Sequence, residues 1–154
     1  METSSELFGI TMNNYTVDVL TPYAIIAKDI PAEALLVPTE RGQINVLKDH
    51  THIVTKLDTG MLSVFGGADD PDRFFGITTG ICKVLDNKVT ILANVAEEAA
   101  DIDKDRAIEA LENAEQRLKE SHGLSNEEIE KYRRKEERAK LRLQLHDFVR
   151  SRNI

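Results

Sequence analysis

The sequence has few of the features on which disulfide-bonded and membrane-spanning proteins depend. Its 154 residues include one cysteine, Cys82, so no internal disulfide can form, and no C-x-x-C metal spacing occurs. This pattern fits a reducing compartment, with Cys82 buried as a small hydrophobic side chain. No apolar run approaches the ~18 residues of a membrane-spanning helix. Residues 1–14 are polar and acidic, unlike a secretion signal. We therefore expect a soluble, cytoplasmic-type protein.

Motifs that carry catalysis are also missing. The chain has no Walker phosphate-binding loop, no G-x-G-x-x-G dinucleotide motif and no G-x-S-x-G nucleophile turn. His50 and His52 alternate along the chain, but two histidines complete neither a zinc site nor a catalytic triad. We predict no catalytic residues, no metal site and no enzyme activity of the chain by itself.

What the sequence does contain is a change of hydrophobic period near Glu97. Before this point, apolar residues alternate or form short runs between Gly, Pro and Asp; after it, they recur three and four apart amid dense charge. A period near two indicates β-strands and a period near 3.6 indicates helices. The pattern predicts a loose tail at 1–14, a β domain at 15–98 and a helical domain at 99–154.

The β part shows short strands separated by turn-forming residues. Tyr15, Val17 and Val19 share one face of the first strand, which is typical of half-buried alternation. Many short strands without helical periods between them favour an antiparallel sandwich or barrel over an α/β nucleotide-binding fold. The predicted strands span 15–19, 23–27, 34–37, 44–47, 53–57, 61–65, 73–78, 81–85 and 88–94.

The C-terminal part predicts two helices that form an antiparallel hairpin. Asp101 and Asp103 are cap candidates for the first helix, Gly123 is a candidate for its end, and Ser125 with Glu128 forms a capping box for the second. The apolar stripe of the first helix is Ala107, Ala110, Leu111, Ala114 and Leu118. Because alanine burial contributes little, the hairpin is a candidate moving part, although a static hairpin is equally open.

Charge is unevenly distributed between the two parts. Residues 1–100 contain 14 Asp and Glu against 7 Lys and Arg, whereas 101–154 contain 13 of each, so the net charge of −7 belongs to the β part. A nucleic-acid partner is excluded for the β part, because binding phosphates requires clustered cations. Residues 131–142 hold seven cations against two glutamates. This run is either a solvated helix face or a surface that docks on an acidic protein.

Several stretches together resemble one known family. They are 38–50, with the sequence P-T-E-R-G-Q-I-N-V-L-K-D-H, followed by 57–60, 80–84 and 89–93, and then 102–107, which matches an I-D-x-x-R-A motif. In this order and spacing they resemble the epsilon subunit of F-type ATP synthases, over about residues 15 to 150. The resemblance implies an all-β N-terminal sandwich followed by a C-terminal antiparallel two-helix hairpin.

The resemblance also implies a role and partners. The chain would be a non-catalytic central-stalk subunit that binds the gamma subunit and the c-ring through its sandwich and couples H⁺- or Na⁺-driven rotation to the catalytic head. It would lie at the cytoplasmic face of a bacterial plasma membrane, touching the membrane only through the complex. Its hairpin would transiently reach the alpha and beta subunits and inhibit ATP hydrolysis. The implied inhibitory basic face is Arg133, Arg134, Lys135, Arg138, Lys140 and Arg142.

The resemblance implies that the chain requires no cofactor, although some family members bind regulatory ATP in the hairpin. Carried over by position, the ATP-binding residues would be Glu97, Ile102, Asp103, Arg106, Arg138 and Arg142. Asn113 replaces an arginine of the nucleotide-binding members. In the ordinary alternative, Asp103 caps the first helix and Arg106 pairs across the hairpin. The competing function is a free-standing ATP-binding sensor or adaptor whose hairpin closes on nucleotide.

The resemblance further implies a loop that faces the c-ring. Its candidate contact residues are Arg41, Gln43, Lys48 and His50. Gln43 stands where family members carry an acidic residue, so a ring contact would rely on the cations, His50 or backbone groups.

Overall fold

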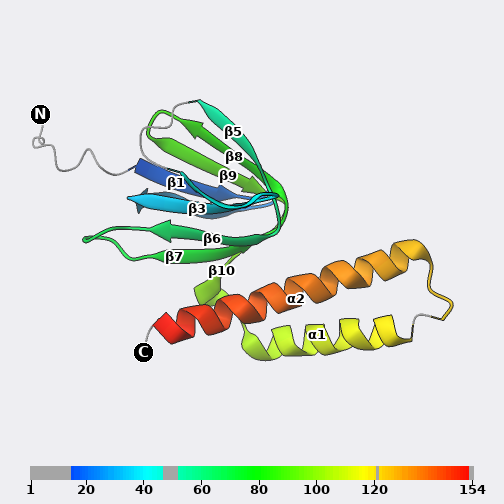
Figure 1. Cartoon of the computed structure of the whole chain (residues 1–154). Helices are drawn as coiled ribbons and strands as arrows, with labels where there is room; N and C mark the ends of the chain where they lie inside the picture. Colours follow the sequence, from blue (N-terminus) through cyan, green and yellow to red (C-terminus); the bar gives the residue numbers. More distant parts are fainter. Residues whose placement is uncertain (1–14, 47–51, 121, 153–154) are drawn as a thin grey trace, which may run out of the picture. The chain divides into compact units, whose positions relative to one another are not determined.

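The structure is a computed structural model that describes residues 15–46, 52–120 and 122–152 (Figure 1). The chain divides between Glu98 and Ala99 into two compact units. The first is a sandwich of two five-stranded sheets, and the second contains two helices. The predicted combination of a β-sandwich and a two-helix hairpin is confirmed.

One sheet has the strand order β2-β1-β9-β8-β5. These strands are β1 (Tyr15–Leu20), β2 (Ile25–Ala32), β5 (Ile53–Leu57), β8 (Gly80–Leu85) and β9 (Lys88–Ala93). The pairing of β1 with β9 is parallel, in a register from Thr16 opposite Lys88 to Leu20 opposite Leu92, and the other pairs are antiparallel. The first strand of the sandwich therefore closes against the last strand of the same sheet.

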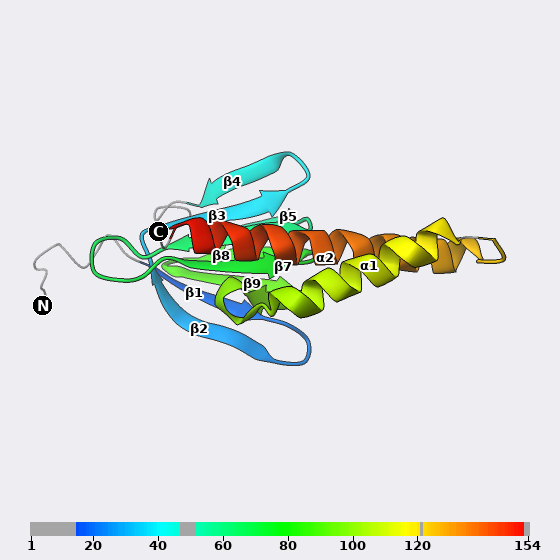
Figure 2. The ribbon, with the colours of Figure 1, turned by 90° about the horizontal axis from the view of Figure 1, so that it is seen from below.

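The other sheet is antiparallel and has the order β10-β7-β6-β3-β4. Its strands are β3 (Ala34–Thr39), β4 (Gly42–Val46), β6 (Gly60–Phe65), β7 (Arg73–Ile77) and β10 (Ala96–Glu98). Figure 2 shows that β3 and β4 form a hairpin with β4 as the outer strand.

The core lies between the sheets and is built from alternate residues of each strand. Val17 and Val19 of β1 and Ile91 of β9 face Leu35 and Phe75 of the second sheet, and all five are fully buried. Each contributes about 1.5–3 kcal/mol to folding when its side chain leaves water. Cys82 is buried in this core, as predicted, and burial raises its pKa to about 11. The thiol is therefore protonated at neutral pH.

Tyr15 joins the two sheets through a polar contact. Its hydroxyl donates a buried hydrogen bond of 2.6 Å to the carbonyl oxygen of Val46, which belongs to β4 in the opposite sheet. Burial raises the pKa of the Tyr15 hydroxyl, so it remains a donor. The bond satisfies two groups that would otherwise be buried without partners.

The bounds of β2 differ from the predicted strand at 23–27. The chain turns at Tyr23 and Ala24, whose backbone N–H groups donate to Thr21 Oγ1 at 3.3 and 3.1 Å, so the strand begins later. It then continues through Pro31, although the sequence analysis treated this proline as a strand breaker. Because β2 is the edge strand of its sheet, a residue without an N–H is tolerated there.

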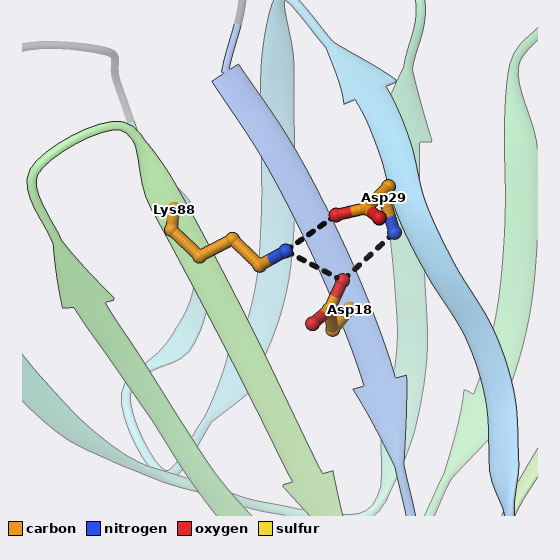
Figure 3. A network of polar contacts seen from close by, with 3 residues as sticks. All are labelled: Asp18, Asp29 and Lys88. Carbon is orange, nitrogen blue, oxygen red and sulfur yellow. Dashed lines mark hydrogen bonds and ion pairs between the residues drawn. The ribbon is translucent and has the colours of Figure 1, made fainter.

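A bulge in β2 is held by a three-residue polar network (Figure 3). Val17 pairs with Ile30 and Val19 with Ala27, so two residues of β2 lie opposite Asp18. Asp18 Oδ1 accepts from the backbone N–H of Asp29 at 2.8 Å and lies 3.1 Å from Lys88 Nζ of β9. Lys88 also donates to Asp29, and this bond holds the Asp29 pKa below and the Lys88 pKa above their usual ranges. The network ties three adjacent strands together.

The helical unit begins with a short 3₁₀ turn (Ala99–Asp101) and contains α1 (Lys104–Lys119) and α2 (Asn126–Arg152). The predicted capping box is confirmed: Ser125 Oγ accepts from the N–H of Glu128, and Glu128 Oε1 accepts from the N–H of Ser125, both at 3.2 Å. Gly123 does not end the first helix as predicted, because α1 already ends at Lys119, with Glu120 as its C-cap. Gly123 instead adopts a positive φ of 87° in the connecting turn.

Candidate functional site

The contact between α1 and α2 is made by small side chains. In both views the two helices run side by side and antiparallel (Figure 1, Figure 2). Of the helix residues that the structure describes, the buried ones are Ala107 and Ala114 on α1 and Ala139 and Leu145 on α2. Three of these four bury only a methyl group, so the apolar seam of the hairpin is thin, as the sequence predicts.

A groove of about 740 Å³ lies between the two helices. That volume falls within the range of small-molecule sites. Ala114 and Ala139 form its floor, because their small side chains leave space that larger residues would fill. Its walls are Ala110, Asn113, Gln116, Arg117 and Glu120 from α1 and Tyr132, Lys135, Arg138 and Arg142 from α2.

Cations converge on an aromatic ring at this groove. The charged groups of Arg117, Lys131 and Lys135 lie 5.7, 5.9 and 5.7 Å from the ring centroid of Tyr132. Contacts of this kind offset part of the repulsion among the cations. The one carboxylate of the lining belongs to Glu120, and it accepts a 3.4 Å hydrogen bond from Gln116. The groove is therefore strongly cationic.

The predicted inhibitory basic face includes cations that pair with glutamates of the same helix and cations that line the groove. Arg134 lies 3.9 Å from Glu130 and Lys140 lies 4.0 Å from Glu136, each one helical turn away. Such exposed pairs contribute little to stability. Lys135, Arg138 and Arg142 instead face the groove, whereas Arg133 does not line it.

The structure brings together only part of the predicted ATP-binding set. Arg138 and Arg142 both line the groove, whereas Ile102, Asp103 and Arg106 do not. Asp103 is the N-cap of α1, where its Oδ1 accepts from the backbone N–H of Arg106 at 3.2 Å. The structure thus shows Asp103 in the role of helix cap, the alternative to ATP binding that the sequence left open. An ion pair across the hairpin joins Lys104 and Asp147 at 3.5 Å, whereas Arg106 forms none with the described residues.

Glu97, the remaining member of that set, lies on β10 in the sandwich unit, opposite Gly76. Its neighbour Glu98 forms a bidentate ion pair with Arg73 of β7. Arg73 Nε and Nη2 donate to the two carboxylate oxygens of Glu98, each at 2.7 Å. This bidentate pair holds the last strand of the sandwich at the point where the helical unit begins.

Three residues that line the groove were not predicted from the sequence as members of a common site. Arg117 and Tyr132 were not singled out, and Lys135 was placed only on the basic face. The spacing of Tyr132, Lys135, Ala139 and Arg142 is typical of one helical face, which is a usable signal. It does not reveal which face of α1 lies opposite.

The predicted ring-facing loop is described only in part. Arg41 and Gln43 are exposed at the turn into β4 and on that strand, and Gln43 Nε2 lies 3.5 Å from the carbonyl oxygen of Met61. Lys48 and His50 lie outside the described residues. Within the described ranges, no helix is long and apolar enough to span a membrane, and no cluster of three metal-binding side chains occurs.

Comparisons with known proteins converge on one family. Residues 14–99 match the family described as "ATP synthase, Delta/Epsilon chain, beta-sandwich domain". The ATP synthase epsilon chain of Persephonella marina is 34% identical over 131 residues, covering 85% of this chain and 95% of that protein. That of Symbiobacterium thermophilum is 35% identical, covering 71% and 77%, and the chloroplastic one of Cucumis sativus is 41% identical, covering 68% and 76%.

A solved structure shares the fold. A chain in the mitochondrial ATP synthase of Euglena gracilis, determined as an OSCP/F1/c-ring assembly in rotational state 1, superposes with a TM-score of 0.61. The match covers 92% of this chain and 82% of that one, at 20% sequence identity.

Proposed function

This chain belongs to the family of ATP synthase epsilon chains, and from that premise we propose that it is a non-catalytic central-stalk subunit of a rotary F-type ATP synthase. Its sandwich binds the gamma subunit and the c-ring, and the complex couples H⁺- or Na⁺-driven ring rotation to the catalytic head. The observation that carries the proposal is the match over residues 14–99, followed by a helical hairpin. The subunit acts at the cytoplasmic face of the bacterial plasma membrane.

The different build of the two units supports a division of labour. The sandwich has a continuous core of fully buried side chains, which suits a rigid base that transmits torque. The hairpin has a thin, alanine-rich seam, which suits a part that changes position when a partner or ligand binds. We assign partner binding to the sandwich and regulation to the hairpin.

The hairpin inhibits ATP hydrolysis in this proposal, by presenting its basic face to an acidic surface of the alpha and beta subunits. The test is ATP hydrolysis by the assembled complex carrying either the full chain or a chain ending at Glu98. We expect hydrolysis to rise on truncation while the complex still assembles. Unchanged hydrolysis would remove the inhibitory role for this member.

A variant with two substitutions tests whether inhibition depends on the charge of the hairpin or only on its presence. Replacing Arg133 and Arg134 by Gln removes two cations of the basic face that do not line the groove. Replacing Lys119 by Gln, at the exposed end of α1, removes one cation outside the basic face and provides a control. We expect the double variant to raise hydrolysis and K119Q to leave it unchanged.

The ring contact rests on the β3–β4 turn. Arg41 is exposed in this turn and Gln43 is exposed on the edge strand β4, so both side chains and the backbone of β4 are accessible to a partner. We extend the contact to Lys48 and His50 from the sequence alone. Cross-linking from cysteine placed at Gln43 to the c-ring tests it, and a cysteine at Lys83, on the outer face of the other sheet, is the control.

The second candidate function is ATP sensing by the hairpin, favoured by Arg138 and Arg142 facing one groove. Guanidinium groups pair well with phosphates, so bound ATP would hold the helices together. Calorimetric titration of the full chain with ATP tests it. Absence of binding at millimolar ATP would leave the rotor function standing and reject the sensor.

A further inference from the structure

The outer face of the sheet β2-β1-β9-β8-β5 carries an exposed row of apolar side chains (Figure 1). The strand register places four of them directly opposite one another on neighbouring strands, and we call them the apolar row: Ile25, Leu20, Leu92 and Ile81. Leu20 is half-buried, and the other three are 39–65% exposed. Adjacent strands lie about 4.8 Å apart, so the row extends about 14 Å across the sheet.

The apolar row is bordered by cations on the same face. Lys56 of β5 lies opposite Ile81 and ends the row, and Lys83 points outward from β8 one position along. Within the part of the chain that the structure describes, Lys83 is exposed and forms no ion pair. Contiguous exposed apolar side chains with a polar border are typical of a surface that is covered by another segment or molecule. A segment that fits this face would be apolar at the row and acidic beside it.

Residues 1–14 precede β1 and lie outside the described residues, but their sequence has this composition. Leu7 and Phe8 are adjacent large apolar residues, and Glu2 and Glu6 come before them. No Lys or Arg occurs in the segment. Its side-chain charge is therefore opposite to that of the lysines on the outer face, and the segment carries large side chains that could cover apolar surface.

The length of the segment allows Phe8 to reach the row. The row crosses β1 at Leu20, which lies five residues beyond Tyr15, or about 17 Å along the strand. Phe8 precedes Tyr15 by seven residues, and a chain of that length spans at most about 23–25 Å. Met12 precedes Tyr15 by three residues, so its limit of about 10–11 Å is too short.

We propose that residues 1–14 fold back over the outer face of this sheet, and that Leu7 and Phe8 cover the apolar row. The glutamates of the segment lie beside the lysines of the same face. Burial of the two large side chains and of the row stabilises this arrangement. The segment thereby shields the row from contact with a second copy of the chain.

A fluorescent probe tests the contact in the full chain. The chain contains no tryptophan, so Phe8→Trp introduces a single one. We expect its emission to lie at shorter wavelength, and acrylamide to quench it less, than for the control Thr3→Trp. Adding Leu92→Ser should lower the ratio of covered to uncovered row about fivefold, as expected for the loss of part of a buried leucine contact.

A matched control separates the row from the rest of the face. Leu85 is 42% exposed and Leu92 39% exposed, and Leu85 points outward from β8 but lies outside the row. Leu85→Ser should therefore change the ratio by less than about twofold.

Disulfide trapping tests the same contact without a tryptophan. Under mild oxidation, we expect a chain with Phe8→Cys and Leu92→Cys to form a bond within one molecule, identified by mass spectrometry of a digest. A chain with Met12→Cys and Leu92→Cys should not, because position 12 is too close to β1 to span the distance. Cys82 does not compete, because its thiol is buried and protonated at neutral pH.

Any of four results would overturn the proposal. Equal emission and quenching at positions 8 and 3 would mean that the segment leaves the row open. A bond from position 8 that forms only between two molecules would mean that a second copy covers the row. An effect of L85S as large as that of L92S, or trapping of position 12 as readily as position 8, would mean that the contact is not made at the row.

Discussion

The bidentate pair between Arg73 and Glu98 anchors the end of the sandwich, and Glu98→Gln tests how firmly. The two hydrogen bonds are 2.7 Å long, and the side chains are only 32% and 20% exposed. An exposed pair contributes 0–1 kcal/mol, and a hydrogen bond to a charged group contributes more when it is shielded from water. For this half-buried pair we expect Glu98→Gln to lower the free energy of unfolding by about 1–2 kcal/mol.

Two measurements check that value. Urea unfolding of the full chain gives the global loss, and hydrogen exchange reports whether the amides of β10 open more often. A loss of about 1.4 kcal/mol confined to β10 would raise its open population tenfold. The control is Lys56→Gln, which removes a 4.0 Å pair with Glu40 whose side chains are 77% and 74% exposed, and which should cost under about 0.5 kcal/mol. If E98Q costs no more than K56Q, or leaves β10 exchange unchanged, the anchoring role is refuted.

Three further predictions concern single positions. Gly80→Ala would place a Cβ 2.1 Å from the carbonyl oxygen of Leu92, so we expect a loss of at least about 2 kcal/mol in thermal unfolding; a neutral result would contradict the close approach of β8 and β9. Ser125→Ala removes the capping box of α2 and should cost about 1 kcal/mol in helix unfolding followed by far-ultraviolet circular dichroism. The lowered pKa of Asp29 means that its contribution is present above the ordinary aspartate pKa of about 4 and is lost as pH falls through the lower folded-state value. Urea midpoints measured down to about pH 3 should therefore fall less steeply for Asp29→Asn than for the unmodified chain, and equal slopes would contradict the assignment.

Much of the sandwich could be predicted because apolar and polar residues alternate clearly along its strands. Val17 and Val19 are inward-facing by period alone, and both are fully buried. The strand β10 was missed because Ala96, Glu97 and Glu98 show no alternation, and pairing with β7 and the contact of Glu98 with Arg73 stabilise the strand instead. β2 continues through Pro31 because it is the edge strand of its sheet, where a proline is tolerated. The sequence alone does not give the strand order, so it could not predict this length.

The candidate site could be predicted less well than the fold. The spacing along α2 places Lys135, Arg138 and Arg142 near one face, but the helix faces that meet depend on rotations set by Ala114 and Ala139, whose methyl groups allow many packings. Arg117 therefore became a candidate only once the two helices were placed together. Asp103 shows the opposite case, because one carboxylate before a helix serves equally as a cap or as a ligand, and the structure decides for the cap.

The parallel pairing of β1 with β9 has a consequence for how the protein is made. A ribosome releases residues in order, so β1 emerges long before Lys88 and its neighbours are available as partners. Until then only β2 can pair with it, and its other edge stays open to wrong partners, such as the same segment of another nascent chain. Closure of the sandwich is thus postponed until β9, which ends at Ala93, has been synthesised. A prematurely terminated product that ends before β9 should be a substrate for chaperones and proteases rather than a smaller working subunit.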